Sequence, residues 1–313
     1  MRETRWATLS SVPLFLALAG LCMAQPPVHD LDAIRVQATR LDTSVLDTPA
    51  SVSVFEGEHM RAGRFRVNLS ESLGGSPGLQ IQNRENYAQD LQVSIRGFGA
   101  RSTFGVRGVR LYVDGIPATM PDGQGQTSNI DIESIDRVEV LRGPFSALYG
   151  NSSGGVIQVF TEEGGLPATL SGTVSADSHG SWRYGAKARG LADVGETQLD
   201  YVVSLNRYTT HGFRDHSGAR KNLGNAKLGL QIDDDTRLTL IANSVSVRAD
   251  DPLGLDRQAF DDDPQSAVSN ATLYNTRKSV DQTQGGLVFE KRLSEASEVR
   301  AMAYYGQRDM VQY

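Results

Sequence analysis

Six side chains that could hold an anionic ligand are spread over three loops in the first half of the sequence. The loops are residues 83–90, 98–105 and 117–129. They carry arginines, aromatic residues and polar or soft side chains: Arg84, Tyr87, Arg101, Phe104, Met120 and Gln124. Because a guanidinium group is a good carboxylate partner, this set would suit an anionic metal chelate. For any single residue, a polar loop surface without a ligand is an equally good interpretation.

Two further arginines stand in otherwise apolar segments. Arg96 lies in SIRGF (residues 94–98) and Arg142 in EVLRGP (residues 139–144). A buried arginine without an acidic partner is costly. Both segments are expected to be strands, so either each arginine has a partner elsewhere or both are exposed on a strand surface.

Three other constellations do not build a reactive site. His211, Asp215 and His216 share a long loop and could touch a metal, but solvated histidines are the commoner outcome. Residues 261–263 are three aspartates without calcium-ligand spacing. Residues 150–154 fit G-x-S-x-G, a motif that needs a strand before it and a helix after it; here we expect an aromatic loop and then a strand. We therefore predict no catalytic residue, no metal site and no cofactor, and no enzyme.

Composition and the first residues narrow the class further. The 313 residues carry a net charge of −6, which argues against a nucleic-acid partner. Residues 1–24 combine Arg2 and Arg5 with an apolar run and then Cys22-Met23-Ala24, which predicts a secretory signal peptide. A retained anchor and a lipoprotein acylated at Cys22 are the alternatives. No later stretch is apolar for long enough to form a transmembrane helix.

Residues 41–165 read as a compact α+β domain. We predict one helix at residues 65–73, stopped by Gly74-Gly75. Strands separated by Gly, Pro and Asn-rich loops are predicted at residues 51–55, 79–82, 91–95, 109–113, 137–141 and 155–161.

Residues 166–313 instead show sustained alternation with a period of two. Leu199, Tyr201, Val203 and Leu205 share one face of a predicted strand. Short polar turns alternate with long loops at residues 210–221 and 250–280, as in outer-membrane barrels, where the long loops are external. About seven strands cannot close around the α+β domain, which would need roughly twenty-two. The sequence is thus predicted to be a fragment; two adjacent domains with a small open sheet are the alternative.

Four motifs carry a family resemblance. LDAIRVQATR (residues 31–40) resembles a TonB box, although an ordinary first strand is the alternative. SIRGF, LYVDGIP (residues 111–117) and IDRVEVLRGPFSALYG with GGVIQV (residues 135–150 and 154–159) resemble the plug signatures of TonB-dependent outer-membrane receptors, in the same order and spacing.

The resemblance implies a mainly β fold, with an α+β plug (residues 41–165) inside a large antiparallel transmembrane barrel that starts at residue 166. Residues 25–40 would carry the coupling segment, left free at the mature N-terminus, with Ile34, Arg35, Val36, Gln37 and Ala38 meeting TonB of the inner membrane. Arg96, Glu139 and Arg142 would latch the plug, with the acidic wall partners of both arginines beyond Tyr313.

The implied function is active transport across the outer membrane of a Gram-negative bacterium, in a monomeric receptor surrounded by lipid. The expected cargo is a ferric siderophore or another iron complex. Cobalamin, copper or an oligosaccharide are alternative cargoes, and a passive porin or adhesion barrel is an alternative of another class.

Overall fold

The computed structural model describes residues 35–37, 43–44, 47–102, 105–120, 123–150, 152–195, 197–295 and 297–313. Residues 35–313 form one compact unit. The predicted signal peptide and most of the predicted coupling segment lie outside the described residues. No described helix is both long enough and apolar enough to cross a membrane.

The amino-terminal part of the unit is an α+β fold around a five-stranded sheet with the order β3-β8-β9-β6-β7. Strands β6 and β9 are parallel and the other pairs are antiparallel. The strands are β3 (Ser51–Glu56), β6 (Val109–Val113), β7 (Ile116–Pro117), β8 (Ile135–Arg142) and β9 (Gly155–Thr161), and a separate ribbon pairs β4 (Leu79–Gln82) with β5 (Gln92–Ile95). The helices are α1 (Gly57–Arg61), α2 (Ser70–Leu73), the 3-10 turn η2 (Ile132–Ser134) and α3 (Ser146–Tyr149).

Apolar side chains from the sheet and the first two helices form the core of this part. Ile135, Val138 and Ile157 are fully buried in it, and Met60 and Leu73 cover them from α1 and α2. Helix α1 starts directly against β8, since a Cβ at Gly57 would lie 1.9 Å from the carbonyl oxygen of Ile135. Only glycine allows this backbone contact.

The predicted helix at residues 65–73 is wrong in its first half. Only Ser70–Leu73 is helical. The carboxylate of Glu71 accepts the backbone N–H groups of Arg66, Val67 and Asn68 at 2.6, 2.7 and 2.8 Å. Arg66 also adopts φ +67°, which a helix does not allow. The side chain of Glu71 therefore holds the backbone of residues 66–68 in a non-helical turn ahead of the short helix.

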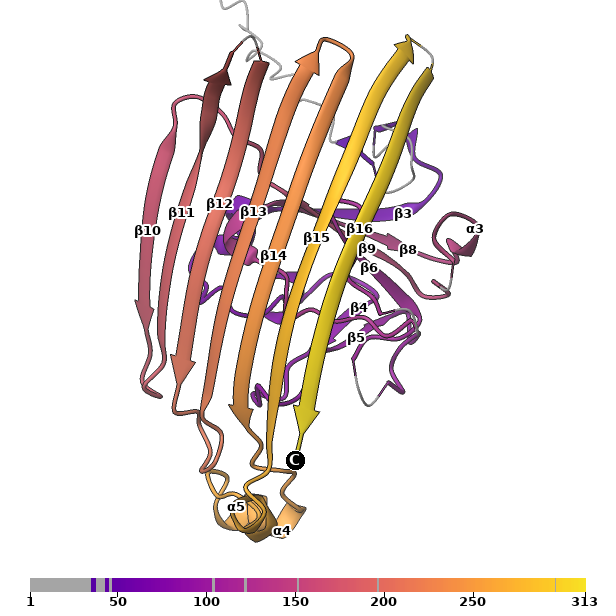
Figure 1. Ribbon diagram of the computed structural model, residues 1–313. Coiled ribbons are helices and arrows are strands. Elements are labelled where there is room, and N and C mark those ends of the chain that lie inside the picture. Colours follow the sequence, from indigo (N-terminus) through magenta and orange to yellow (C-terminus); the bar gives the residue numbers. More distant parts are fainter. Residues whose placement is uncertain are drawn as a thin grey trace, which may run out of the picture. The chain divides into compact units, whose positions relative to one another are not determined.

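The carboxyl-terminal part is a seven-stranded antiparallel sheet whose strands pair in chain order, here called the wall (Figure 1). This confirms the predicted antiparallel architecture. The strands are β10 (Thr169–Ala176), β11 (Trp182–Val194), β12 (Thr197–Thr210), β13 (Ala219–Asp233), β14 (Thr236–Asp250), β15 (Arg277–Ser294) and β16 (Ser297–Gln312).

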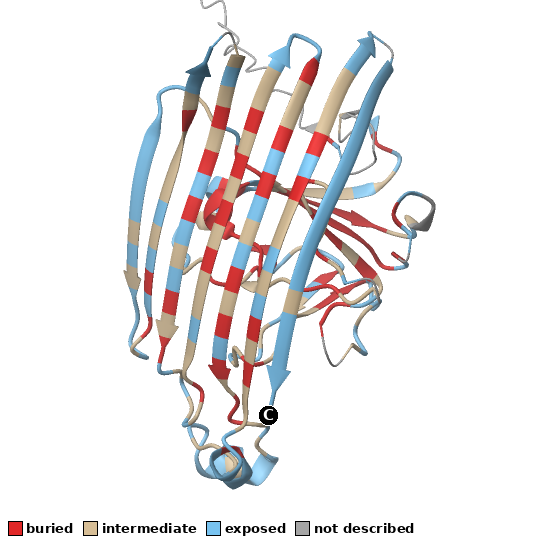
Figure 2. Ribbon diagram, viewed as in Figure 1, coloured by how far each residue is buried: buried red, intermediate tan, exposed pale blue. Residues whose placement is uncertain are grey.

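The wall is polar toward the α+β part and apolar on its outer face. On β12, Asp200 and Ser204 are buried, whereas Leu205 is 63% exposed. Figure 2 shows the same alternation as buried and more exposed bands along β12, β13 and β14. The apolar face predicted from the period-two pattern is thus the outward face, as a surface that meets lipid requires.

Connections at the two ends of the wall differ in length. Strands β13 and β14 are separated only by residues 234–235, whereas residues 211–218 join β12 to β13 and residues 251–276 join β14 to β15. The longest connection contains two short helices that the sequence did not suggest, α4 (Arg257–Asp262) and α5 (Ser269–Leu273), and both lie at the same end of the wall (Figure 1).

Candidate functional site

The described part of the predicted coupling segment is held in a short ribbon. Strand β1 (Arg35–Val36) pairs with β2 (Thr43–Ser44). Val36 is fully buried, so the expectation that this segment is free is wrong for Val36. The N–H of Gln37 donates to Oε2 of Glu139 at 3.0 Å. Ile34 and Ala38 lie outside the described residues.

Glu139 connects this ribbon to the central sheet of the α+β part. Its side chain is completely buried on β8, and Oε1 accepts from Nε of Arg137 at 2.9 Å. The carboxylate therefore contacts both the predicted coupling segment and a cation on its own strand. A shift of the ribbon would remove one of these two interactions.

The predicted latch residues are not all brought together. Residues 139 and 142 are three apart on β8, and side chains of a strand alternate, so they point to opposite faces. Arg96 lies in the turn after β5 with φ +50° and is exposed, which corrects its predicted place in a strand. Arg96 and Arg142 do meet, around Gly78: a Cβ there would lie 3.4 Å from Cγ of Arg96 and 3.8 Å from Cδ of Arg142.

Arg142 is buried among hydroxyl groups. Its guanidinium donates to Ser53 Oγ at 2.8 Å, to Ser51 Oγ at 3.5 Å and to Ser76 Oγ through a short bond. Burial and then the neighbouring charge of Arg96 lower the pKa of Arg142 from its usual value. Arg96 and Arg142 thus place two positive charges close together beside Gly78.

Ion pairs between the α+β part and the wall were missed by the sequence analysis. Glu133 of η2 lies 2.8 Å from Nη2 of Arg183 on β11, and Glu162 lies 2.8 Å from Nζ of Lys187. The same polarity recurs where Asp114 meets Lys227 at 3.4 Å and Asp90 meets Lys278 at 2.8 Å. In these pairs the acid is on the α+β part and the base is on the wall, the reverse of the predicted latch.

Glu133 also pairs with a base of the α+β part itself. Its carboxylate also accepts from Nη1 of Arg66 at 3.0 Å. Burial alone would raise the pKa of Glu133, but the hydrogen bonds and charges of Arg66 and Arg183 bring it below its usual value. Glu133 is therefore a buried anion held between two arginines.

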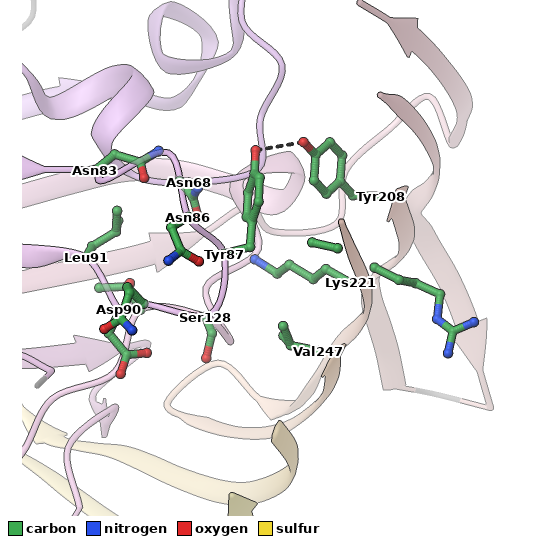
Figure 3. A pocket seen from close by; sticks show the side chains of 14 residues that line it. Asn68, Asn83, Asn86, Tyr87, Asp90, Leu91, Ser128, Tyr208, Lys221 and Val247 are labelled. Carbon is green, nitrogen blue, oxygen red and sulfur yellow. Dashed lines mark hydrogen bonds between the residues drawn. The ribbon is translucent and has the colours of Figure 1, made fainter. Parts of the chain in front are cut away.

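Among the candidate ligand residues, Tyr87 turns toward the wall. Its hydroxyl lies 2.7 Å from that of Tyr208 on β12, and the two rings are 5.1 Å apart (Figure 3). Burial, then interaction with Tyr208, raises the pKa of Tyr87. Lys221 extends into the same cavity of about 40 Å³, where Nζ donates to the carbonyl of Val67 at 3.1 Å.

The loop that carries Tyr87 is also fixed by the connection between β14 and β15. The two carboxylate oxygens of Asp251 accept from Nδ2 of Asn86 at 2.8 Å and Nε2 of Gln89 at 2.6 Å. Arg214 ties residues 211–218 to the same loop, since its guanidinium donates to the carbonyls of Leu253 at 2.6 Å and Ser266 at 2.9 Å.

Of the other candidate ligand residues in the described ranges, two are exposed and two belong to one turn. Arg84 and Arg101 are exposed. Met120 is 38% exposed, and its N–H donates to the carbonyl of Gln124 at 2.8 Å within one turn. Gln124 packs against Gly105, so the second and third loops adjoin. Phe104 lies outside the described residues.

No group of three or more potential metal ligands occurs in the ranges that the structure describes. His216 uses Nε2 to contact the carbonyl oxygen of Thr276 at 2.9 Å. The G-x-S-x-G segment has helix α3 before it and strand β9 after it, the opposite order from the hydrolase motif. The aromatic loop predicted before it is thus partly helical.

Comparison with known proteins agrees with this geometry. Residues 44–156 match the model of the TonB-dependent receptor plug domain. The chain is 30% identical to the ferrienterobactin receptor of Escherichia coli K12 over 187 residues, covering 53% of this chain and 22% of that protein. It is 30% identical to the pesticin receptor of Yersinia enterocolitica over 237 residues, covering 70% of this chain and 33% of that protein.

Solved structures share the fold. The unliganded ferric citrate transporter FecA aligns with a TM-score of 0.68 at 20% identity, covering 86% of this chain and 41% of that chain. The ferric yersiniabactin uptake receptor FyuA of Yersinia pestis aligns with a TM-score of 0.66 at 22% identity, covering 84% and 41%. Both alignments span the α+β part together with the wall.

An α+β plug joined by buried ion pairs to an antiparallel wall defines the class: the chain belongs to the TonB-dependent receptors. It spans 22% to 33% of the length of the two curated relatives described above. The part that it represents is the plug with seven wall strands.

Proposed function

We propose that the receptor containing this chain carries a scarce nutrient across the outer membrane into the periplasm, with energy supplied through TonB. The observation that carries the proposal is the attachment of the plug to the wall. Four acids of the plug pair with four bases of the wall, Glu133–Arg183, Glu162–Lys187, Asp114–Lys227 and Asp90–Lys278. A plug fixed in this way would block passive diffusion, so movement of cargo requires work on the plug.

The coupling role of residues 34–38 is part of this proposal. The contact between Gln37 and Glu139 supports it, since it gives tension on the amino-terminal segment a direct connection to the central sheet of the plug. The outward apolar face of the wall supports a place in the outer membrane, in contact with lipid. We propose that the receptor acts as a monomer.

A ferric siderophore or similar iron complex is the proposed cargo. The relatives described above include receptors named for ferrienterobactin and ferric yersiniabactin. A relative of 27% identity over 242 residues is named as a vitamin B12 transporter, which keeps cobalamin as the second candidate. It covers 72% of this chain and 38% of that protein.

Growth of a deletion strain under iron limitation would test the proposal. Candidate ferric chelates are added one at a time, with and without a functional TonB, and cobalamin is added in a parallel assay. We expect one ferric chelate to restore growth only when both the receptor and TonB are present. Growth restored without TonB would indicate a passive barrel. A response to cobalamin, with no response to any ferric chelate, would identify cobalamin as the cargo.

A further inference from the structure

The loop between β4 and β5 contains five consecutive residues that each contact the wall. These residues, 86–90, are called here the docking segment. Two of its side-chain amides donate to the carboxylate of Asp251 at 2.8 and 2.6 Å. Its last residue, Asp90, lies 2.8 Å from Nζ of Lys278 on β15. Both ends of the docking segment are thus held by charge-assisted hydrogen bonds, which are stronger than neutral ones.

The middle of the docking segment covers an apolar patch on the inner face of the wall. Tyr87 packs against this patch, and its hydroxyl meets that of Tyr208 on β12. Ala88 is 1% exposed and lies in one cluster with buried side chains of β13, β14 and β15: Leu223, Val245, Val247, Ala249 and Val280. Withdrawal of the docking segment would expose these side chains to water, which is unfavourable.

The five-stranded sheet and the turn η2 meet the wall mainly through charged side chains. Glu133 and Glu162 pair with bases of β11. Ile116 of β7 adds a smaller apolar contact, with Ile241 and Val288. When water enters between the partners of an ion pair, both charges recover their hydration, which offsets much of the lost attraction. This joint can therefore open at a lower cost than the apolar contact of the docking segment.

The two attachments also differ in their connection to the amino-terminal ribbon. Gln37 of that ribbon donates to Glu139 on β8, a strand of the five-stranded sheet. The docking segment instead belongs to the β4–β5 ribbon, which forms a separate sheet. Tension on residues 35–37 is therefore transmitted directly to the five-stranded sheet and only indirectly to the docking segment.

We infer that the docking segment is the fixed attachment of the plug and stays on the wall while the five-stranded sheet shifts during transport. The inference rests on the proposed function and adds the pivot of the movement. A few loop residues commonly act as the pivot when one body moves against another. Tyr87, a candidate ligand residue, is thereby assigned to attachment of the plug.

Two matched cysteine pairs in the full-length receptor test the inference. Asp90→Cys with Lys278→Cys replaces an acid–lysine pair at the docking segment, and Glu162→Cys with Lys187→Cys replaces one at the five-stranded sheet, both pairs being 2.8 Å apart. A reducible bis-methanethiosulfonate linker bridges each cysteine pair. Cells are given radioactive ferric citrate, ferrienterobactin and ferric yersiniabactin in turn, and TonB-dependent uptake is measured before and after reduction of the linker.

We expect the bridge at the docking segment to leave uptake unchanged, because that attachment does not move. The bridge at the five-stranded sheet should stop uptake until the linker is reduced. Uptake that is stopped by the bridge at the docking segment, or equal uptake with both bridges, would overturn the inference.

Thiol labelling of the purified receptor in urea tests the attachment without cargo or TonB. Ala88→Cys and Ser134→Cys each alter a small, almost completely buried residue, and the hydroxyl of Ser134 accepts from Nδ2 of Asn225 on the wall at 3.3 Å. With the unaltered receptor as the blank, we expect Ser134→Cys to react at a lower urea concentration than Ala88→Cys. The reverse order, or equal midpoints, would contradict the inference. If the unaltered receptor takes up no chelate, the proposed function fails, and the order of labelling still decides which attachment is fixed.

Discussion

Nη2 of Arg183 on the wall lies 2.8 Å from Oε2 of Glu133 on the plug, and both side chains are almost completely buried. Arg66 approaches the same carboxylate from the plug side at 3.0 Å. Glu133 therefore lies between one cation of its own domain and one of the wall. A single change at Glu133 therefore affects one contact within the plug and one between the plug and the wall.

Replacing Glu133 by glutamine should loosen the plug. Removing one partner of a buried pair leaves an uncompensated charge and costs about 3–5 kcal/mol. We expect a lower unfolding midpoint in urea for the detergent-solubilised receptor. Asp261→Asn is the control, since its pair with Arg257 is exposed and should contribute less than about 0.5 kcal/mol. Equal midpoints for the two variants would contradict the assigned role of Glu133.

Acidification should weaken plug docking in a defined direction. The pKa of Glu133 is lowered in the folded receptor from its usual value of 4.5. The stabilisation is therefore complete above the unfolded pKa and is lost as pH falls through the folded value. Urea midpoints measured between neutral pH and about pH 3 should fall more steeply for the unaltered receptor than for Glu133→Gln. Parallel pH profiles would assign the acid sensitivity to other carboxylates.

Proline at Ile34 or Val36 should abolish transport and leave cargo binding intact. Proline lacks the N–H that a strand needs to pair, and Val36 pairs with Thr43 in the described ribbon. Val36→Ala keeps the N–H and serves as the control, with most uptake retained. Transport is measured as uptake of a radioactive ferric chelate by cells, and cargo binding is measured separately with the same chelate at 4 °C. Normal uptake by both proline variants would exclude this segment as the coupling site.

Orientation in the membrane can be read by cysteine labelling, with the unaltered receptor as the control for its own cysteines; the single cysteine of the 313 residues is Cys22, within the predicted signal peptide. We expect Leu255→Cys, in the long connection after β14, to react with an impermeant maleimide on intact cells. Gly195→Cys, directly after β11, should react only after the outer membrane is opened. The reverse pattern would show that the long loops face the periplasm.

Local patterns were sufficient for most of the fold. The bounds of β4, β6 and β9 agree with the prediction, since each is a short run rich in strand-forming apolar residues or alternating with polar ones, between turn residues. The outward face of β12 followed from the alternation around Leu205. Helix α1 was missed because it is only five residues long and is defined by the contact of Gly57 with β8.

The site was harder to predict because its contacts join distant parts of the chain. Arg183 and Glu133 are separated by 50 positions, and nothing local pairs them. A signal was present in retrospect: Arg183, Lys187 and Arg189 alternate on one face of β11, and an inward basic face needs acids opposite to it. The prediction placed the arginines of the latch on the plug, whereas the described pairs have their bases on the wall.

The contacts of Asp251 and Arg214 also determine where the receptor can be altered. Asp251 binds two amides of the plug loop, and Arg214 fixes the backbone around Leu253. An affinity tag inserted at either place would disrupt these contacts. Helix α4, by contrast, has no buried residue, and even its Phe260 is exposed. Because this segment packs against little else, a peptide epitope can be inserted there. The connection between β14 and β15 thus combines an end fixed by hydrogen bonds with a segment in which an epitope can be inserted.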